Sequence, residues 1–170
     1  MTIEINGHDG DLPDAYIAIV VSRYNSSITG NLLEGALETL RAAGIDDERI
    51  VVAEVAGAWE LVLPSLNFAI SPPIAGVIVL GAVIRGETTH DQHINRAVTT
   101  ALMNASIDSD TPIALGLLTC NSVEQAIQRS GGSVGNKGIE AAEALLDSLR
   151  LAVKMKEMLA EDDEPAGEAE

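Results

Sequence analysis

Nearly continuous apolar runs alternate with amphipathic segments along this chain. The apolar runs cover residues 15–21, 49–55, 74–81 and 112–119. Strands of this kind, which lack a polar residue at every second position, are typical of a parallel sheet covered on both faces. The segments between and after them place apolar residues at helical spacing, and they predict helices over 26–43, 59–70, 91–108, 122–129 and 138–159.

The order of these elements predicts an α/β fold. With right-handed crossovers it becomes a three-layer α/β/α sandwich around a four-stranded parallel sheet, of the doubly wound, flavodoxin-like kind. Ser26 or Ser27 can cap the first helix, and Ser122 can cap the fourth. We expect an N-terminal arm over residues 1–14, one domain over 15–159 and an acidic, disordered tail over 160–170.

Composition excludes several classes of partner. The formal charge of −16 over 170 residues argues against nucleic acid and anionic membranes, since both favour a basic protein surface. The N-terminus has neither a basic region nor an apolar run, and no stretch is apolar over the length of a membrane span. The single cysteine, Cys120, rules out an internal disulfide and suits a reducing compartment. We therefore expect a cytoplasmic protein.

The most informative segment follows the third apolar run, in Gly81-Ala-Val-Ile-Arg-Gly-Glu-Thr-Thr-His90. It delivers a glycine, an arginine, two hydroxyls and a histidine to the carboxyl end of a strand, just before a helix. Ligands of open α/β sheets bind at this place, and the free amides of a helix start favour anions such as phosphate. Histidine exchanges protons near neutral pH. The segment therefore predicts a phosphate site beside a proton shuttle.

Two further groups of residues are candidates for binding a ligand. Gly57 permits a tight turn after the second strand, and Trp59 and Glu60 stand at the start of the following helix; Tyr24 follows the first strand. An indole or phenol ring offers a stacking face, and a carboxylate accepts hydrogen bonds from N–H groups of a ligand. Farther along, Arg129 and Lys137 bracket a glycine-rich bend and can clamp an anion.

Each of these residues also has a plain structural interpretation. Trp59 and Tyr24 could belong to the core, and Glu60 could serve only to complement a helix dipole. His90 and His93 lie three positions apart without a cluster of carboxylates or thiolates, so we expect no metal site. Cys120 is more simply the end of a buried strand than a nucleophile. Arg129 and Lys137, taken separately, would be ordinary surface charges.

Taken together, the motifs resemble those of the lumazine synthases, the penultimate enzymes of riboflavin biosynthesis. The resemblance runs from about residue 17 to residue 151. It is carried by Ser22-Arg-Tyr-Asn25, Glu34-Gly35-Ala36, Val55-Ala-Gly-Ala-Trp-Glu60, Leu80 to His90, Gly116-Leu-Leu-Thr119, Glu124-Gln125-Ala126, Arg129 and Asn136-Lys-Gly138. The block at 80–90 is its most specific part.

The resemblance implies an activity and no cofactor. The family condenses 5-amino-6-(D-ribitylamino)uracil with 3,4-dihydroxy-2-butanone 4-phosphate, two small-molecule substrates, to 6,7-dimethyl-8-ribityllumazine. His90 matches the proposed general acid/base. Phosphate binding is implied for Gly86, Glu87, Thr88 and Arg129. Contacts to the pyrimidine and the ribityl chain are implied for Tyr24, Asn25, Ala58, Trp59, Glu60, Val83, Ile84, Leu115 and Lys137.

The chain departs from the family pattern at several positions. Trp59 replaces a phenylalanine, Ala56 a proline, and Leu115 an aromatic residue of the fourth strand. After His90 the family often continues with an aromatic residue, whereas this chain continues Asp91-Gln-His-Ile-Asn-Arg96. These changes leave the phosphate loop, His90 and Arg129 in place.

The resemblance also implies an assembly. Family members form pentamers with each active site between neighbouring subunits, and the neighbour supplies Arg129 and Lys137. The short step between these two residues favours a shell of sixty subunits, and the N-terminal segment is a candidate for pairing with a neighbouring subunit. Riboflavin synthase is a candidate partner.

Two other functions are compatible with the same architecture. A non-catalytic shell protein that binds lumazine or flavin would keep the fold and the pocket. A phosphoacceptor domain shares the architecture, but it needs an aspartate after the third strand, where this chain has Gly81-Ala-Val-Ile84.

Overall fold

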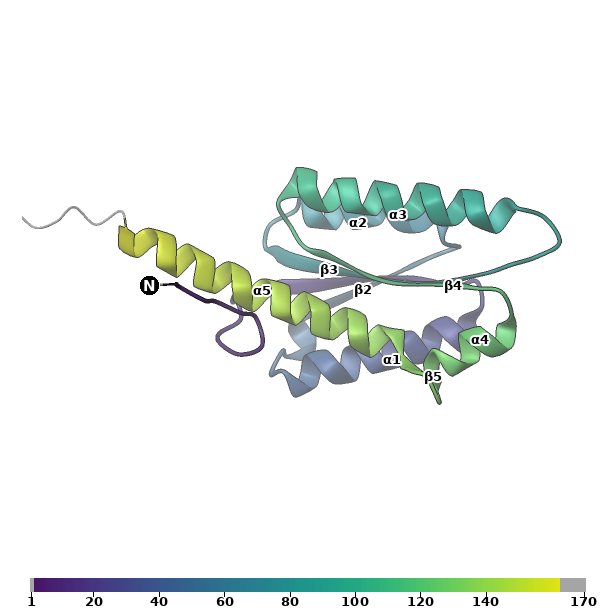
Figure 1. Ribbon diagram of the computed structural model, residues 1–170, viewed down its shortest axis with the longest axis horizontal. Coiled ribbons are helices and arrows are strands. Elements are labelled where there is room, and N and C mark those ends of the chain that lie inside the picture. The colour runs from purple at the N-terminus through teal and green to yellow at the C-terminus, as the bar shows by residue number, and fades with distance from the viewer. Residues whose placement is uncertain (1, 163–170) are drawn as a thin grey trace, which may run out of the picture.

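A four-stranded parallel sheet forms the middle layer of the protein (Figure 1). The computed structural model describes residues 2–162. The sheet contains β1 (Tyr16–Ser22), β2 (Ile50–Val55), β3 (Ile74–Ile84) and β4 (Ile113–Cys120), in the order β2-β1-β3-β4. All three pairings are parallel. The prediction of a three-layer α/β sandwich with four parallel strands is thereby confirmed.

Helices cover both faces of this sheet. On one face lie α1 (Ser26–Ala42), α4 (Val123–Gln128) and α5 (Lys137–Asp162). On the other lie η2 (Trp59–Leu61), α2 (Val62–Ala69) and α3 (His90–Ser109). A short 3-10 turn, η1 (Asp47–Arg49), precedes β2, and a small antiparallel ribbon joins β5 (Ser130–Gly132) to β6 (Gly135–Asn136) before α5.

The two faces of the sheet build two separate cores. Successive side chains of a strand point to opposite faces. In β1, Ile17 and Ile19 therefore pack under α1 and α5, whereas Ala18 and Val20 pack under α2 and α3. All four are buried, which explains why the middle of the strand is apolar on both faces.

Helices α1 and α5 cross in close contact. Gly138, at the start of α5, is buried against the backbone of Leu32, and a Cβ atom built on it would lie 1.9 Å from the Leu32 carbonyl oxygen. A glycine is therefore needed at this crossing. The close contact sets the position of the first turn of α5, directly after the β5–β6 ribbon.

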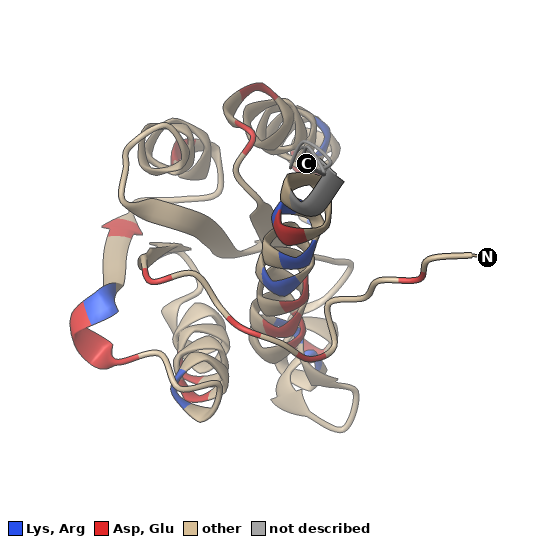
Figure 2. Cartoon of the chain, turned by 90° about the vertical axis from the view of Figure 1, so that its left-hand side faces the viewer, with Lys and Arg blue, Asp and Glu red and all other residues tan. Residues whose placement is uncertain are grey.

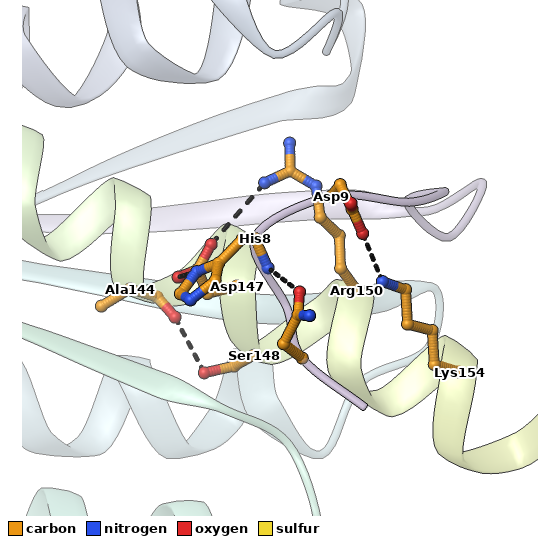
Figure 3. A network of polar contacts seen from close by, with 8 residues as sticks. His8, Asp9, Ala144, Asp147, Ser148, Arg150 and Lys154 are labelled. Carbon is orange, nitrogen blue, oxygen red and sulfur yellow. Dashed lines mark hydrogen bonds and ion pairs between the residues drawn. The ribbon is translucent and has the colours of Figure 1, made fainter. Parts of the chain in front are cut away.

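The N-terminal arm lies along α5 and is held there by polar contacts (Figure 3). His8 Nδ1 is 3.3 Å from Asp147 Oδ2, and the Lys154 ammonium donates to Asp9 Oδ1 over 2.5 Å. Gly7 packs directly on the backbone of Asp147. Figure 2 shows acidic and basic residues interspersed along α5. The arm is thus fastened to the helix by exposed ion pairs and one close backbone contact.

Several predicted boundaries differ from the structure. Strand β3 continues three residues past position 81, because Val83 and Ile84 still pair with Thr119 and Cys120 of β4. Neither Ser26 nor Ser27 caps α1: the helix follows Asn25, which has a left-handed backbone and makes no side-chain cap. The cap predicted at Ser122 is confirmed, since its Oγ accepts a bond from the Gln125 amide over 3.3 Å.

The last helix is longer than the sequence pattern predicted. Helix α5 begins at Lys137 and continues to Asp162, past the predicted end at 159. The predicted acidic tail falls mainly on residues 163–170, which lie outside the described residues. Within residues 2–162, no helix is both long and apolar enough to span a bilayer.

Candidate functional site

A cavity of about 450 Å³ opens at the carboxyl ends of β1, β2 and β3. Its walls come from the loops that follow these three strands and from the first turns of α3. The lining residues are Tyr24, Asn25, Gly57, Ala58, Trp59, Glu60, Ala82, Val83, Ile84, Gly86, Thr88, His90, Asp91 and Ile94. Ten of the fourteen residues proposed from the sequence thus line one space: Tyr24, Asn25, Ala58, Trp59, Glu60, Val83, Ile84, Gly86, Thr88 and His90.

Backbone hydrogen bonds hold the first two loops in register. The amides of Arg23 and Tyr24 donate to the carbonyls of Val55 and Ala56, over 2.8 and 3.1 Å. Asn25, with φ of 61°, turns the chain into α1, and its Nδ2 donates to the Ala82 carbonyl over 3.0 Å. Asn25 therefore ties the β1 loop to β3 across the floor of the cavity.

The aromatic residues of the cavity are exposed. Tyr24 is 73% and Trp59 59% accessible in the single chain, so the core interpretation of both is wrong. Glu60 Oε2 accepts a hydrogen bond from the Gly57 amide over 3.0 Å. That bond orients the Glu60 carboxylate within its own turn.

The predicted phosphate loop runs from the end of β3 to the start of α3. His90 is the first residue of α3 and is exposed, and its backbone N–H donates to Thr88 Oγ1 over 3.4 Å. Nothing lies within 4 Å of a Cβ atom built on Gly86, so the loop is open on that side. Glu87 is exposed in the loop but does not line the cavity.

Leu115, Arg129 and Lys137 lie away from the cavity of their own chain. The small ribbon brings the backbones of Arg129 and Lys137 together, since the Lys137 amide donates to the Arg129 carbonyl over 2.9 Å. The Lys137 ammonium also bonds the Glu140 carboxylate, and Arg129 Nη1 donates to the Gln125 carbonyl over 3.3 Å. Leu115, on the edge strand β4, is 46% accessible.

Cys120 is buried at the end of β4, as the simpler interpretation of it predicted. Burial raises the pKa of its thiol, and the nearby positive charge of Arg129 only partly opposes this shift. Cys120 therefore favours the protonated form, which is not the reactive one.

Four cavity residues were absent from the predicted set: Gly57, Ala82, Asp91 and Ile94. The sequence pattern indicates Gly57 only as a turn residue. Asp91 and Ile94 follow His90 on α3, and the helical spacing of Ile94 from His90, four positions, could have indicated that both face the same space. Among residues 2–162 there is no group of three potential metal ligands.

A second, apolar groove of about 760 Å³ lies beside the cavity, between α2 and α3. The two spaces share Trp59 and Glu60. The groove is lined by Val55, Ala56, Trp59, Glu60, Val62, Leu63, Pro64, Leu66, Ala97, Val98 and Ala101. Leu63 within it is exposed, although burial of such a side chain is favourable.

Comparison with known proteins gives two consistent results. Residues 14–152 match the sequence profile that describes 6,7-dimethyl-8-ribityllumazine synthase. A protein of that name from Rhodopirellula baltica (strain DSM 10527 / NCIMB 13988 / SH1) is 51% identical over 152 residues, which cover 89% of this chain and 98% of the relative. Because both matches span most of the chain, the chain belongs to the 6,7-dimethyl-8-ribityllumazine synthase family.

Proposed function

We propose that the protein condenses 5-amino-6-(D-ribitylamino)uracil with 3,4-dihydroxy-2-butanone 4-phosphate, releasing 6,7-dimethyl-8-ribityllumazine, phosphate and water. Its family supports a role in riboflavin biosynthesis. The observation that carries the proposal is the single cavity that combines two exposed rings, the oriented Glu60, the open loop at Gly86–Thr88 and His90.

Each part of the cavity suits one part of the reaction. Tyr24 and Trp59 offer faces on which a pyrimidine can stack. Glu60 accepts hydrogen bonds from N–H or O–H groups of the same substrate. The Gly86–Thr88 loop, just before α3, presents amides and a hydroxyl to the phosphate, which the helix dipole also favours.

The chemistry then requires proton transfers between two substrates held in register. The 5-amino nitrogen attacks the ketone carbon, water leaves to form an imine, and phosphate is eliminated. The elimination leaves an enol, which tautomerises to a new ketone. The ribityl-bearing amine attacks this ketone, a second water leaves, and the second ring closes. In this proposal His90, which lies beside the loop, gives and takes these protons. We attribute most of the acceleration to orientation of the two substrates.

We further propose that the site is completed by a neighbouring subunit in a head-to-tail pentamer. Leu115, Arg129 and Lys137 lie outside the cavity of their own chain, so a neighbour would have to bring them to it. The apolar groove between α2 and α3 offers one half of a heterologous interface, and the exposed apolar residues Leu115, Ile127 and Val134 offer a different surface for the other half.

We also propose a larger assembly of these pentamers and a partner for it. The short ribbon between Arg129 and Lys137 favours packing of pentamers into a shell of sixty subunits. Such a shell could enclose or bind riboflavin synthase. Size-exclusion chromatography with light scattering separates a pentamer, a decamer and a shell by mass.

The activity is tested by mixing the purified protein with both substrates and following lumazine absorbance against an enzyme-free control, because the substrates also condense unaided. We expect a clear acceleration that falls sharply in Arg129→Ala and less sharply in His90→Ala. A folded, assembled protein that gives no acceleration overturns the proposal, and a non-catalytic shell that binds lumazine or flavin becomes the better account.

A further inference from the structure

One carboxylate of the cavity has an oxygen without a partner. Asp91 is half-buried at the start of α3 and lines the cavity beside His90 and Ile94. Its Oδ1 is shielded from solvent, and it receives no hydrogen bond from any described residue. Asn95, one helical turn later, also has a buried Oδ1 without a donor, but it does not line the cavity.

A buried carboxylate oxygen without a donor is costly, because the hydration it loses is not replaced. The dipole at the start of α3 favours a negative charge at Asp91 but donates no hydrogen bond to this oxygen. A donor that enters from the cavity would remove the cost. Oδ1 is shielded in the empty cavity, but a partial rotation about the Cβ–Cγ bond turns it toward the cavity, where a ligand's donor can reach it without moving the helix.

The charge of Asp91 indicates which substrate supplies that donor. A carboxylate repels the phosphate-bearing substrate. The ribitylaminouracil carries amino, ring N–H and hydroxyl groups, all of which can donate. Trp59 and Glu60, which suit this substrate, line the same cavity as Asp91.

We propose that Asp91 is a substrate-binding residue that accepts a hydrogen bond from the ribityl-bearing pyrimidine and thereby selects it. This inference rests on the proposed function above. It also gives a role to one of the departures from the family pattern, since Asp91 stands where an aromatic residue is common. A ring can only cover a ligand at this position, whereas a carboxylate can hold an N–H or O–H group at a fixed direction.

The test compares Asp91→Ala and Asp91→Asn with the wild-type assembly, measuring KM for each substrate separately. Loss of a hydrogen bond to a charged group is expected to raise KM for the ribitylaminouracil in Asp91→Ala by roughly ten- to a hundredfold. KM for the butanone phosphate should not rise, since neutralising Asp91 removes no contact to that substrate and relieves a repulsion of its phosphate. Asp91→Asn should lie between wild type and Asp91→Ala, because its amide keeps one acceptor.

Asp108→Asn is the matched control. It removes the same charge from the same helix, at an exposed position outside the cavity, and should leave both KM values unchanged. If Asp91→Ala binds the pyrimidine substrate as well as wild type does, the inference is wrong. A parallel rise of both KM values, with a lower Tm, also overturns it, because that pattern reports a purely structural role.

A second measurement separates this inference from the proposed function. Binding of 6,7-dimethyl-8-ribityllumazine is followed by its fluorescence, which needs no turnover. If wild type binds lumazine without accelerating the condensation, while Asp91→Ala binds it at least tenfold more weakly, the enzyme proposal fails and the binding role of Asp91 stands. If wild type accelerates the condensation but binds lumazine no more tightly than Asp91→Ala does, the enzyme proposal stands and the binding role of Asp91 is wrong.

Discussion

Tyr24 and Trp59 are two of only four aromatic residues in the chain, and both keep most of their surface exposed at the mouth of the cavity. Residues that are largely exposed contribute little to the free energy of unfolding, whereas stacking on a ligand ring uses the exposed face directly. Their exposure together with their place in the cavity therefore supports the proposal that both rings serve binding.

We therefore expect Trp59→Ala to separate the two effects. The free energy of unfolding of the isolated chain should change by only about 0.5 kcal/mol, as for other surface substitutions. Lumazine affinity should fall by roughly tenfold, the equivalent of about 1.4 kcal/mol of lost ring contact. Urea unfolding and a fluorescence titration measure the two quantities. A large decrease in the free energy of unfolding with unchanged lumazine affinity would show that Trp59 serves folding and not binding.

Cys120 leads to a prediction of low reactivity. Because burial raises the pKa of its thiol, little thiolate is present at neutral pH, and the side chain is also shielded. Iodoacetamide at pH 7.5 should modify the folded protein far more slowly than the protein in guanidinium chloride, as followed by intact mass. Equal rates in the two conditions would contradict the buried position.

Much of the site could be predicted from residue order alone, and the remainder could not for a physical reason. Loops that follow neighbouring parallel strands meet at one edge, so the sequence places Tyr24, Trp59, Glu60 and His90 together. Asp91 was missed because its significance lies in an absent hydrogen bond. Such an absence depends on the distances to every neighbouring donor, and no local pattern encodes them.

At the scale of elements, strand and helix order followed from the sequence, whereas boundaries depended on tertiary contacts. Strand β3 continues to Ile84 because β4 provides partners up to Cys120. The ribbon of β5 and β6 forms within a glycine-rich bend that has no apolar periodicity. Pairing between strands decides both cases, and periodicity within one segment does not contain that information.

The crossing of α1 and α5 gives a prediction with an internal control. Gly138→Ala would place a methyl group against the Leu32 carbonyl, so the helices must separate at a cost of about 1–3 kcal/mol or more. Gly30→Ala, on α1 with nothing within 4 Å, should instead stabilise the protein by about 0.5–1 kcal/mol. Urea unfolding of both variants checks the opposite signs, and a stabilising Gly138→Ala would rule out the close crossing.

The arm on α5 gives a prediction about pH. The hydrogen bond and charge of Lys154 hold the pKa of Asp9 below its ordinary value of 3.8. A depressed carboxyl pKa means that this contact favours the docked arm above pH 3.8 and is lost as the pH falls through the lower folded value. An NMR titration should place Asp9 below 3.8 in wild type and return it toward 3.8 in Lys154→Ala. An unchanged midpoint would show that the arm is not docked in solution.

At the scale of the whole molecule, the sequence-derived residues fall into two groups that one chain keeps apart. Ten of them line the cavity and Glu87 lies in the loop beside it, while Leu115, Arg129 and Lys137 lie elsewhere. A site shared between neighbouring chains predicts that two impaired variants can restore each other's activity above their residual rates. His90→Ala and Arg129→Ala, unfolded and reassembled as an equal mixture, should recover about a quarter of the wild-type rate in a randomly mixed head-to-tail ring.

Each variant reassembled alone serves as the control and should keep only its own reduced rate. The same mixture prepared without unfolding should give the mean of these two rates, provided that subunits do not exchange. Native mass spectrometry would verify that mixed rings have formed. Mixed rings without any recovered rate would show that each chain uses only its own residues.

The overhang of α5 has a practical consequence. The match to the family ends at residue 152, yet the helix continues to Asp162 and leaves the body of the domain (Figure 1). A helix rises about 1.5 Å per residue, so these last ten residues carry the chain roughly 15 Å outward. A peptide or fluorescent protein fused there would begin on a rigid spacer, clear of the cavity and the sheet. In the single chain, a domain fused directly after Asp162 would therefore be held away from the cavity by the helix itself.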